Sequence, residues 1–307
     1  ALGTEQLACQ GQVLVVAEVD CLSGPSLAEC RPDEEPWVRK FDGRTKNPGS
    51  GSSLRKFRPD EEPWVQKFPW VRKFPGSGSS AMAYDSDRNR VVLFGGFGTV
   101  SQYADTWEWD GASWSNVTPT AGSPPARSEH AMAYDSATGT TLLYGGRTTT
   151  EVNDTWEWDG AQWTEYIPRG MDPIPPTRGQ HSMAYDAARS RIVMYGGWLG
   201  GTVDTWEWNG SDWARLLPSP TPEGRRGQAA VYDSLRARFV MFGGIYTLAI
   251  PDLWEWDGTS WSDVTPEATS PPARYDHSMA YDSQRDRIVL YGGDNFSDTW
   301  ELRYVSP

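Results

Sequence analysis

Five repeated glutamates have the residue type and the spacing that could carry out chemistry. They lie in Trp-Glu-Trp segments or the equivalent segment of the last copy, at Glu108, Glu157, Glu207, Glu255 and Glu301. A ring of carboxylates could bind a metal ion or act in acid–base catalysis. A residue found in every copy of a repeat, however, usually builds that repeat. We therefore interpret these glutamates as structural and expect them to pair with backbone groups or with the arginines that open the preceding strands, Arg90, Arg191, Arg238 and Arg287.

Three histidines form a second candidate set, because each follows an arginine by three residues. The pairs are Arg127/His130, Arg178/His181 and Arg274/His277, and a fourth copy has Arg225 and Gln228. Imidazoles that converge from several repeats could bind zinc or copper. No fourth ligand stands out in the sequence. We therefore expect no metal site and no cofactor, and we interpret the histidines as hydrogen-bonding groups between neighbouring repeat units.

Non-repeated residues are the better candidates for ligand contact. They occur in five variable segments, 97–104, 147–153, 198–203, 245–251 and 294–297. Loop residues on a rigid scaffold carry function more often than core residues do. We predict that the following residues contact a ligand: Phe97, Tyr103, Arg147, Trp198, Tyr246, Asn295 and Phe296.

The elements that must position these residues repeat along the chain from residue 81 onwards. The aspartates of five AMAYDS-like segments recur every 47 to 51 residues, at Asp85, Asp135, Asp186, Asp233 and Asp282. Each is followed by an apolar run ending in Gly-Gly, then a variable segment, then a DTWEWDG-like segment. Four copies close with one more tryptophan. Asp-Gly and Asn-Gly favour two-residue hairpin turns, so each copy predicts four short antiparallel strands.

A period near 50, with an aromatic-Gly-Gly strand before a Trp-bearing strand, resembles the kelch repeat. The resemblance covers residues 81–307 and implies an all-β fold, a β-propeller of five four-stranded blades. A six-bladed ring with a degenerate N-terminal blade is the alternative. The fifth copy lacks its outermost strand, and in kelch propellers one terminus usually lends a strand to the blade that holds the other. We expect a segment upstream of residue 81 to pair beside 298–305, with PWVRKF at 69–74 the nearest.

The first 80 residues differ in composition from the rest of the chain. Residues 1–30 form a short segment that holds all three cysteines, Cys9, Cys21 and Cys30, for which one disulfide is the favoured interpretation. Residues 31–80 contain copies of PWVRKF separated by Gly/Ser linkers, and they look engineered or recently duplicated. The net charge of −13 resides wholly in 81–307, the predicted propeller domain. This acidic balance disfavours nucleic acid as a partner, and no apolar run is long enough to span a membrane.

Enzymatic motifs are missing from the sequence. It contains no GxSxG elbow, P-loop or HExxH helix, and the absence of cysteine from 81–307 argues against the copper chemistry of galactose-oxidase-like propellers. We therefore hypothesise a non-catalytic binding or scaffold protein whose loop face docks a protein or peptide. A lectin-like propeller that binds a glycan is the alternative, and an enzyme with a site assembled from loops is the third. The chain begins at Ala without Met, and we expect a secreted or extracellular protein.

Overall fold

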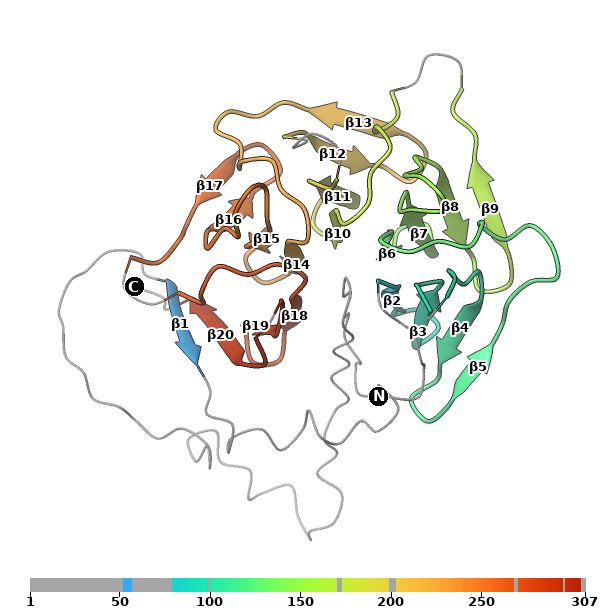
Figure 1. Ribbon diagram of the computed structural model, residues 1–307, viewed down its shortest axis with the longest axis horizontal. Helices are drawn as coiled ribbons and strands as arrows, with labels where there is room; N and C mark the ends of the chain where they lie inside the picture. The colour runs from blue at the N-terminus through green and yellow to red at the C-terminus, as the bar shows by residue number, and fades with distance from the viewer. Residues whose placement is uncertain are drawn as a thin grey trace, which may run out of the picture.

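A computed structural model shows a five-bladed β-propeller (Figure 1). Each blade is a four-stranded antiparallel sheet, and the innermost strands surround a central channel. The described part of the chain contains no helix, and so none that could cross a membrane. The predicted fold class is confirmed, and the six-bladed alternative is wrong. The structure describes residues 52–56, 79–98, 100–169, 173–198, 203–267, 270–294 and 296–304.

Four blades follow the chain in order, and the fifth combines strands from two distant segments. Blade 1 consists of β2 (Ala81–Asp85), β3 (Arg90–Phe94), β4 (Thr106–Trp109) and β5 (Trp114–Asn116). Blade 2 consists of β6 (Ala131–Asp135), β7 (Thr140–Tyr144), β8 (Thr155–Trp158) and β9 (Trp163–Tyr166). Blade 3 consists of β10 (Ser182–Asp186), β11 (Arg191–Tyr195), β12 (Thr205–Trp208) and β13 (Trp213–Leu216). Blade 4 consists of β14 (Ala229–Asp233), β15 (Arg238–Phe242), β16 (Leu253–Trp256) and β17 (Trp261–Asp263). Blade 5 consists of β18 (Ser278–Asp282), β19 (Arg287–Tyr291), β20 (Thr299–Tyr304) and β1 (Ser52–Lys56).

Strand β1 completes blade 5, so the expectation that an upstream segment closes the ring is confirmed. It pairs antiparallel with β20, with Ser52 opposite Tyr304 and Lys56 opposite Trp300. The choice of 69–74 for this place is wrong, and those residues lie outside the described part of the chain. The length of the connection explains this. If 69–74 were the outer strand of blade 5, only six residues, 75–80, would connect it to the inner strand of blade 1. The other blades use longer connections for this path, residues 117–130, 167–181, 217–228 and 264–277.

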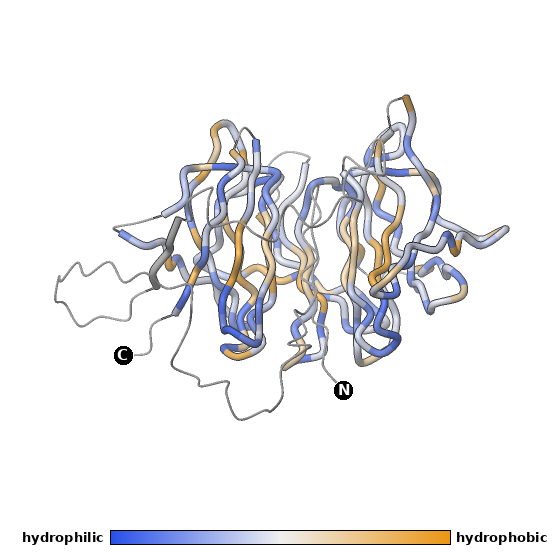
Figure 2. Tube along the Cα trace, turned by 90° about the horizontal axis from the view of Figure 1, so that it is seen from below, coloured by the Kyte–Doolittle hydropathy of each residue, from blue (hydrophilic) through white to orange (hydrophobic). Residues whose placement is uncertain are grey.

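Neighbouring blades pack by matching small residues against large ones. In blade 1, Ala81 and Ala83 lie on the face of β2 that meets blade 2, where Met132 and Tyr134 of β6 cover them. The two sets alternate along each innermost strand because successive side chains point to opposite faces. The AMAYD pattern therefore gives every inner strand one small face and one large face. In Figure 2, a side view of the ring, the most hydrophobic parts of the strands lie between more hydrophilic ends.

The repeated glutamates and tryptophans join one blade to the next. Trp158 Nε1 in blade 2 donates a hydrogen bond of 2.9 Å to Glu108 Oε1 in blade 1. Trp163 Nε1 donates to Thr106 Oγ1 at the same distance. The Glu108 carboxylate also pairs with Arg88 at 2.8 Å, which satisfies a buried charge. The structural interpretation of the glutamates is confirmed.

The arginine partner of the glutamates differs from the expected one in three blades. Glu108, Glu207 and Glu255 pair with an arginine of the turn between the first two strands: Arg88, Arg189 and Arg236. The arginine that opens the second strand directs its guanidinium to a nearby backbone carbonyl instead, as Arg90 Nη1 does to Asn89 O at 3.0 Å. In blade 5, Arg287 lies 3.4 Å from Glu301, as the sequence predicts.

A buried arginine connects each pair of blades from blade 1 to blade 5. Arg127 lies in the segment that joins blade 1 to blade 2, and its side chain is fully buried. Its carbonyl accepts a hydrogen bond from Gly96 N in blade 1 (2.8 Å). Its guanidinium binds Asp154 through both terminal nitrogens, at 2.6 Å each, and donates to Gly145 O at 2.9 Å in blade 2. The same arrangement recurs in the later junctions, at Arg178, Arg225 and Arg274.

The first prediction concerns the ring-closing strand. Along an edge strand, alternate N–H groups face the neighbouring strand, so the double substitution Ser53→Pro/Leu54→Pro removes one pairing hydrogen bond in either register. We expect a loss of roughly 1–3 kcal/mol in the free energy of unfolding, measured by urea denaturation. Ser53→Ala/Leu54→Val keeps both N–H groups and serves as the control. Equal stability of the proline variant and the control would show that β1 does not close the ring.

The second prediction concerns the buried arginine. Arg127→Met leaves the half-buried Asp154 carboxylate without its charged partner, so we expect the free energy of unfolding to fall by about 3–5 kcal/mol. Arg127→Met/Asp154→Leu removes both charges and should recover part of this loss. The comparison uses urea denaturation at neutral pH. A double variant less stable than the single one would contradict the ion-pair explanation.

Candidate functional site

Five loops join the second and third strands of the blades and lie at one end of the ring. We call this end the loop face, formed by the described residues of 97–104, 147–153, 198–203, 245–251 and 294–297. Each loop follows a Gly-Gly pair. In blade 1, Gly95 and Gly96 have φ values of 58° and 105°, and a Cβ on Gly95 would lie 2.7 Å from the Arg127 carbonyl oxygen. Glycine is therefore required for the chain to leave β3 while touching the next blade.

The structure places six of the seven sequence-predicted residues on the loop face with exposed side chains. Arg147 is exposed, and the aromatic residues expose between 36% and 52% of their surface: Phe97, Tyr103, Trp198, Tyr246 and Phe296. Asn295 lies outside the described residues. The six residues come from five different blades, so they share one face of the ring and form no single compact cluster.

Three aliphatic residues that the sequence analysis did not select also lie exposed on the loop face. They are Val100, Val203 and Leu248, with 87%, 48% and 78% of their surface exposed. Together with the aromatic residues they make up most of the large apolar side chains that are exposed among the described residues. An apolar surface concentrated at one end of a scaffold is typical of an interaction site. Their position in the variable loops could have identified them from the sequence, but the sequence analysis selected only aromatic and polar residues from these loops.

The loops are connected to one another across the blades. Gln102 Nε2 in blade 1 donates to the carbonyl oxygens of Arg147 and Thr148 in blade 2, at 2.9 and 2.8 Å. The guanidinium of Arg226 lies 4.0 Å from the centre of the Trp198 ring and donates to Gln180 Oε1 at 3.0 Å. These contacts fix the loop side chains before any ligand arrives.

A chain of backbone hydrogen bonds links the five segments that enter the innermost strands. Glu129 N donates to Ser79 O (2.8 Å), Gln180 N to Glu129 O (2.8 Å), Gly227 N to Gln180 O (3.0 Å) and Asp276 N to Gly227 O (2.7 Å). All five residues have φ values between 53° and 63°. Because each blade contributes one residue, these segments hold a common position on the loop face. Sequence reasoning missed this feature, since neither the residue types nor their spacing are unusual.

Charged groups of both signs surround this backbone chain. Burial raises the pKa of Glu129, and the Glu151 and Asp276 carboxylates add to the effect, while Arg147 and Arg226 oppose it. Desolvation also raises the pKa of Asp276, again opposed by Arg226. This part of the loop face therefore carries both signs of charge. Its carboxylates can pair with a cationic group of a partner, and its arginines can pair with an anionic group.

The three histidines lie buried in the blade junctions, each with its ring edge-on or nearly so to an aromatic residue of the preceding blade. The pairs are Phe94–His130, Tyr144–His181 and Phe242–His277, with ring centroids 5.5 to 5.6 Å apart. In the fourth junction Gln228 Nε2 donates to Tyr195 O at 2.8 Å. The structure thus places the histidines between blades, but the hydrogen bonds predicted for them are not formed within the described residues: both ring nitrogens of all three histidines are buried without a hydrogen-bond partner, and the rings pack against the aromatic residues instead. Among the described residues, no group of three or more His, Cys, Asp or Glu side chains could hold a metal ion.

Burial keeps these histidines neutral. Burial and, to a smaller extent, the charge of the neighbouring arginine, Arg127 or Arg274, lower the pKa of His130 and of His277 to about 3. Burial also lowers the pKa of His181 well below its ordinary value.

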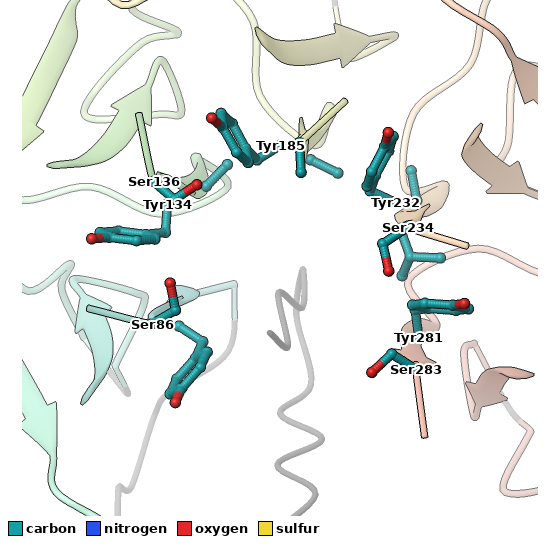
Figure 3. A pocket seen from close by; sticks show the side chains of 14 residues that line it. Ser86, Tyr134, Ser136, Tyr185, Tyr232, Ser234, Tyr281 and Ser283 are labelled. Atoms are coloured by element: carbon teal, nitrogen blue, oxygen red, sulfur yellow. The ribbon is translucent and has the colours of Figure 1, made fainter. Parts of the chain in front are cut away.

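A hollow lies at the end of the ring opposite the loop face, where the innermost strands turn into the second strands (Figure 3). Its volume is about 240 Å³, and its lining consists of five tyrosines, four serines, four alanines and one valine. The sequence analysis did not select these residues, because it treated every repeated position as part of the core. The available signal was the Tyr-Asp-Ser motif itself, in which the serine follows the strand and can face the channel.

No protein-family model matches this chain, and a search of curated proteins finds no match. Any functional conclusion therefore has to come from the geometry described above.

The third prediction concerns pH. The unfolded chain binds a proton at each histidine below about pH 6.5, whereas in the folded chain His130 and His277 do so only near pH 3, and the pKa of His181 is also lowered well below its ordinary value. The stability should therefore fall as the pH drops through this window, by about 1.4 kcal/mol per pH unit for each histidine. The triple variant His130→Gln/His181→Gln/His277→Gln, which places at each junction the residue type that Gln228 already supplies, should show a flatter dependence in urea denaturation between these pH values. Parallel profiles for the variant and the parent protein would contradict this prediction.

Proposed function

We propose that this chain is a kelch-type propeller that binds a protein segment on its loop face, without catalysis. The observation that supports the proposal is the concentration of exposed aromatic and aliphatic side chains on the loops of one end of the ring. Burying such side chains against a partner is favourable, at about 25 cal/mol per Å² of apolar surface.

The composition of the loop face favours a protein partner over a glycan. Val100, Val203 and Leu248 are aliphatic, and they contribute apolar area without any group that would bind sugar hydroxyls. One face of the Trp198 ring is covered by Arg226, which reduces its use as a stacking platform. The five loops also differ in length and composition, so they do not form the equivalent sites that a repeated glycan-binding module would present.

The loop face is suited to binding because it is held in place before a partner arrives. Buried arginines fix the base of four blades, and the Gln102 and Arg226 contacts fix the loops above them. A preorganised surface loses less conformational entropy on association. Trp198 and Tyr246 lie on adjacent blades, and large aromatic residues are frequent hot spots in interfaces.

The fourth prediction tests this proposal with a displayed random-peptide library, selected on the full chain. We expect enriched peptides whose affinity falls by roughly tenfold or more for Trp198→Ala and for Tyr246→Ala, measured by titration calorimetry. Both side chains are exposed, so the fold should be unaffected. Leu235→Ala is the matched control, because Leu235 is 70% exposed in a turn at the opposite end of the ring.

Two outcomes would overturn the proposal. One is selection of peptides that bind Trp198→Ala and Tyr246→Ala as tightly as the parent protein. The other is a glycan array on which the parent protein binds and these two variants do not, with no peptide enriched. The second outcome would assign the loop face to a glycan.

A further inference from the structure

The hollow at the turn end of the channel has a neutral lining of defined geometry. Its polar groups are the hydroxyls of Ser86, Ser136, Ser234 and Ser283, and the fifth blade position is Ala187. Within the described part of the chain these four hydroxyls make no hydrogen bond. In Figure 3 the serines lie on the channel side of the ring, while the labelled tyrosine hydroxyls point away from the channel. The hollow therefore offers a set of hydroxyls without hydrogen-bond partners among the described residues.

The aspartate before each serine holds it in position. Asp85 Oδ1 accepts hydrogen bonds from the backbone N–H groups of Asp87 (3.1 Å) and Arg88 (2.9 Å), which closes the turn around Ser86. Asp135 Oδ1 accepts in the same way from Ala137 N, at 2.9 Å, around Ser136. Equivalent bonds close the turns around Ser234 and Ser283. The serine positions are thus fixed by the fold and need no ligand to order them.

Three of the five tyrosine hydroxyls are hydrogen-bonded to the protein, which leaves their rings as walls. Tyr84 donates to Asn89 Oδ1 at 2.7 Å, and Tyr281 donates to Asp286 Oδ1 at 3.0 Å. The Tyr232 hydroxyl accepts from Ala188 N at 3.2 Å, and burial raises the pKa of this phenol to about 12. The Tyr84, Tyr232 and Tyr281 rings are consequently anchored at their outer ends.

We propose that this hollow binds a monosaccharide or a similar neutral cyclic polyol. Aromatic walls with a few convergent polar groups are the usual composition of a small-molecule site. A volume of about 240 Å³ is below the range of pockets for drug-sized ligands, roughly 300–1,000 Å³, and suits one sugar ring. A charged ligand would lose its hydration there without gaining a counter-charge. The site is independent of the proposed peptide docking, because it lies at the other end of the innermost strands.

The fifth prediction tests the hollow with the full chain and a panel of defined probes. Ligand-observed NMR and titration calorimetry use glucose, galactose, mannose, arabinose and myo-inositol, with glucose 6-phosphate and glucosamine as charged counterparts. We expect at least one neutral probe to bind and its charged counterpart to bind more weakly. Ser136→Ala and Ser234→Ala should each weaken that binding by roughly two- to tenfold.

The chain supplies its own control, because Ala187 shows that alanine fits at this position of the turn. Ser136→Ala/Ser234→Ala should melt at the same temperature as the parent protein, and Ala187→Ser should tighten binding by adding a fifth hydroxyl. Trp198→Ala, on the loop face, should leave sugar binding unchanged, which separates this proposal from peptide docking.

Three results would overturn the proposal. They are the absence of binding by every neutral probe at millimolar concentration, equal binding of the charged counterparts, and unchanged affinity in the folded Ser136→Ala/Ser234→Ala variant. The first would mean that the hollow is filled by water only. The third would place the sugar elsewhere on the molecule.

Discussion

The buried arginine between blades is the interaction on which the rest of the structure depends. An arginine buried away from water needs partners for its charged nitrogens, and each nitrogen of the Arg127 guanidinium has one: Nε donates to Pro125 O in the connecting segment, and the two terminal nitrogens donate to Asp154, one of them also to Gly145 O in blade 2. Its own carbonyl meanwhile receives the Gly96 N–H of the preceding blade. One residue therefore fixes the Gly-Gly turn of two blades at once. Arg127 therefore also helps to position the loops that follow these two turns.

Repeated residues hold the blades together and non-repeated residues form the exposed loop face, with one exception. Repeated tryptophans, glutamates and histidines lie in the junctions, where they bind neighbouring blades. Variable residues such as Trp198 and Tyr246 lie exposed on the loop face. The serines of the Tyr-Asp-Ser turns are the exception, because they are repeated and yet line the hollow of the channel. Repetition around an axis can build a site as well as a core, since it brings the same group to the channel from several blades.

Much of the fold was predictable from the sequence because the repeat determines it. The Gly-Gly and Asp-Gly turns predicted the strand order, but the two-residue turn expected at Asp-Gly is wrong, because Trp109 pairs with Trp114 and the loop between them has four residues, 110–113. The AMAYD alternation agrees with the small-against-large packing of Ala83 and Tyr134. The sequence predicted that an upstream segment closes the ring, but the segment named, 69–74, was wrong. It was chosen for its similarity to the missing strand, without considering how short its connection to blade 1 would be. The Arg88–Glu108 pair was also missed, since a turn residue reaches across the sheet in a way that spacing does not reveal. The loop face was anticipated from variability alone, whereas the channel hollow needed the ring to be assembled first.

The pairing of β1 with β20 has a consequence for the order of folding. Every other strand pair joins close sequence neighbours, so blades 1 to 4 can form from local hairpins as the chain is synthesised. Blade 5 joins the first described strand to the last, so β1 must stay unpaired until the whole ring has been made. An unpaired strand is open to association with other chains. The interval between the synthesis of β1 and of β20 is thus the period in which this protein is most exposed to misassembly.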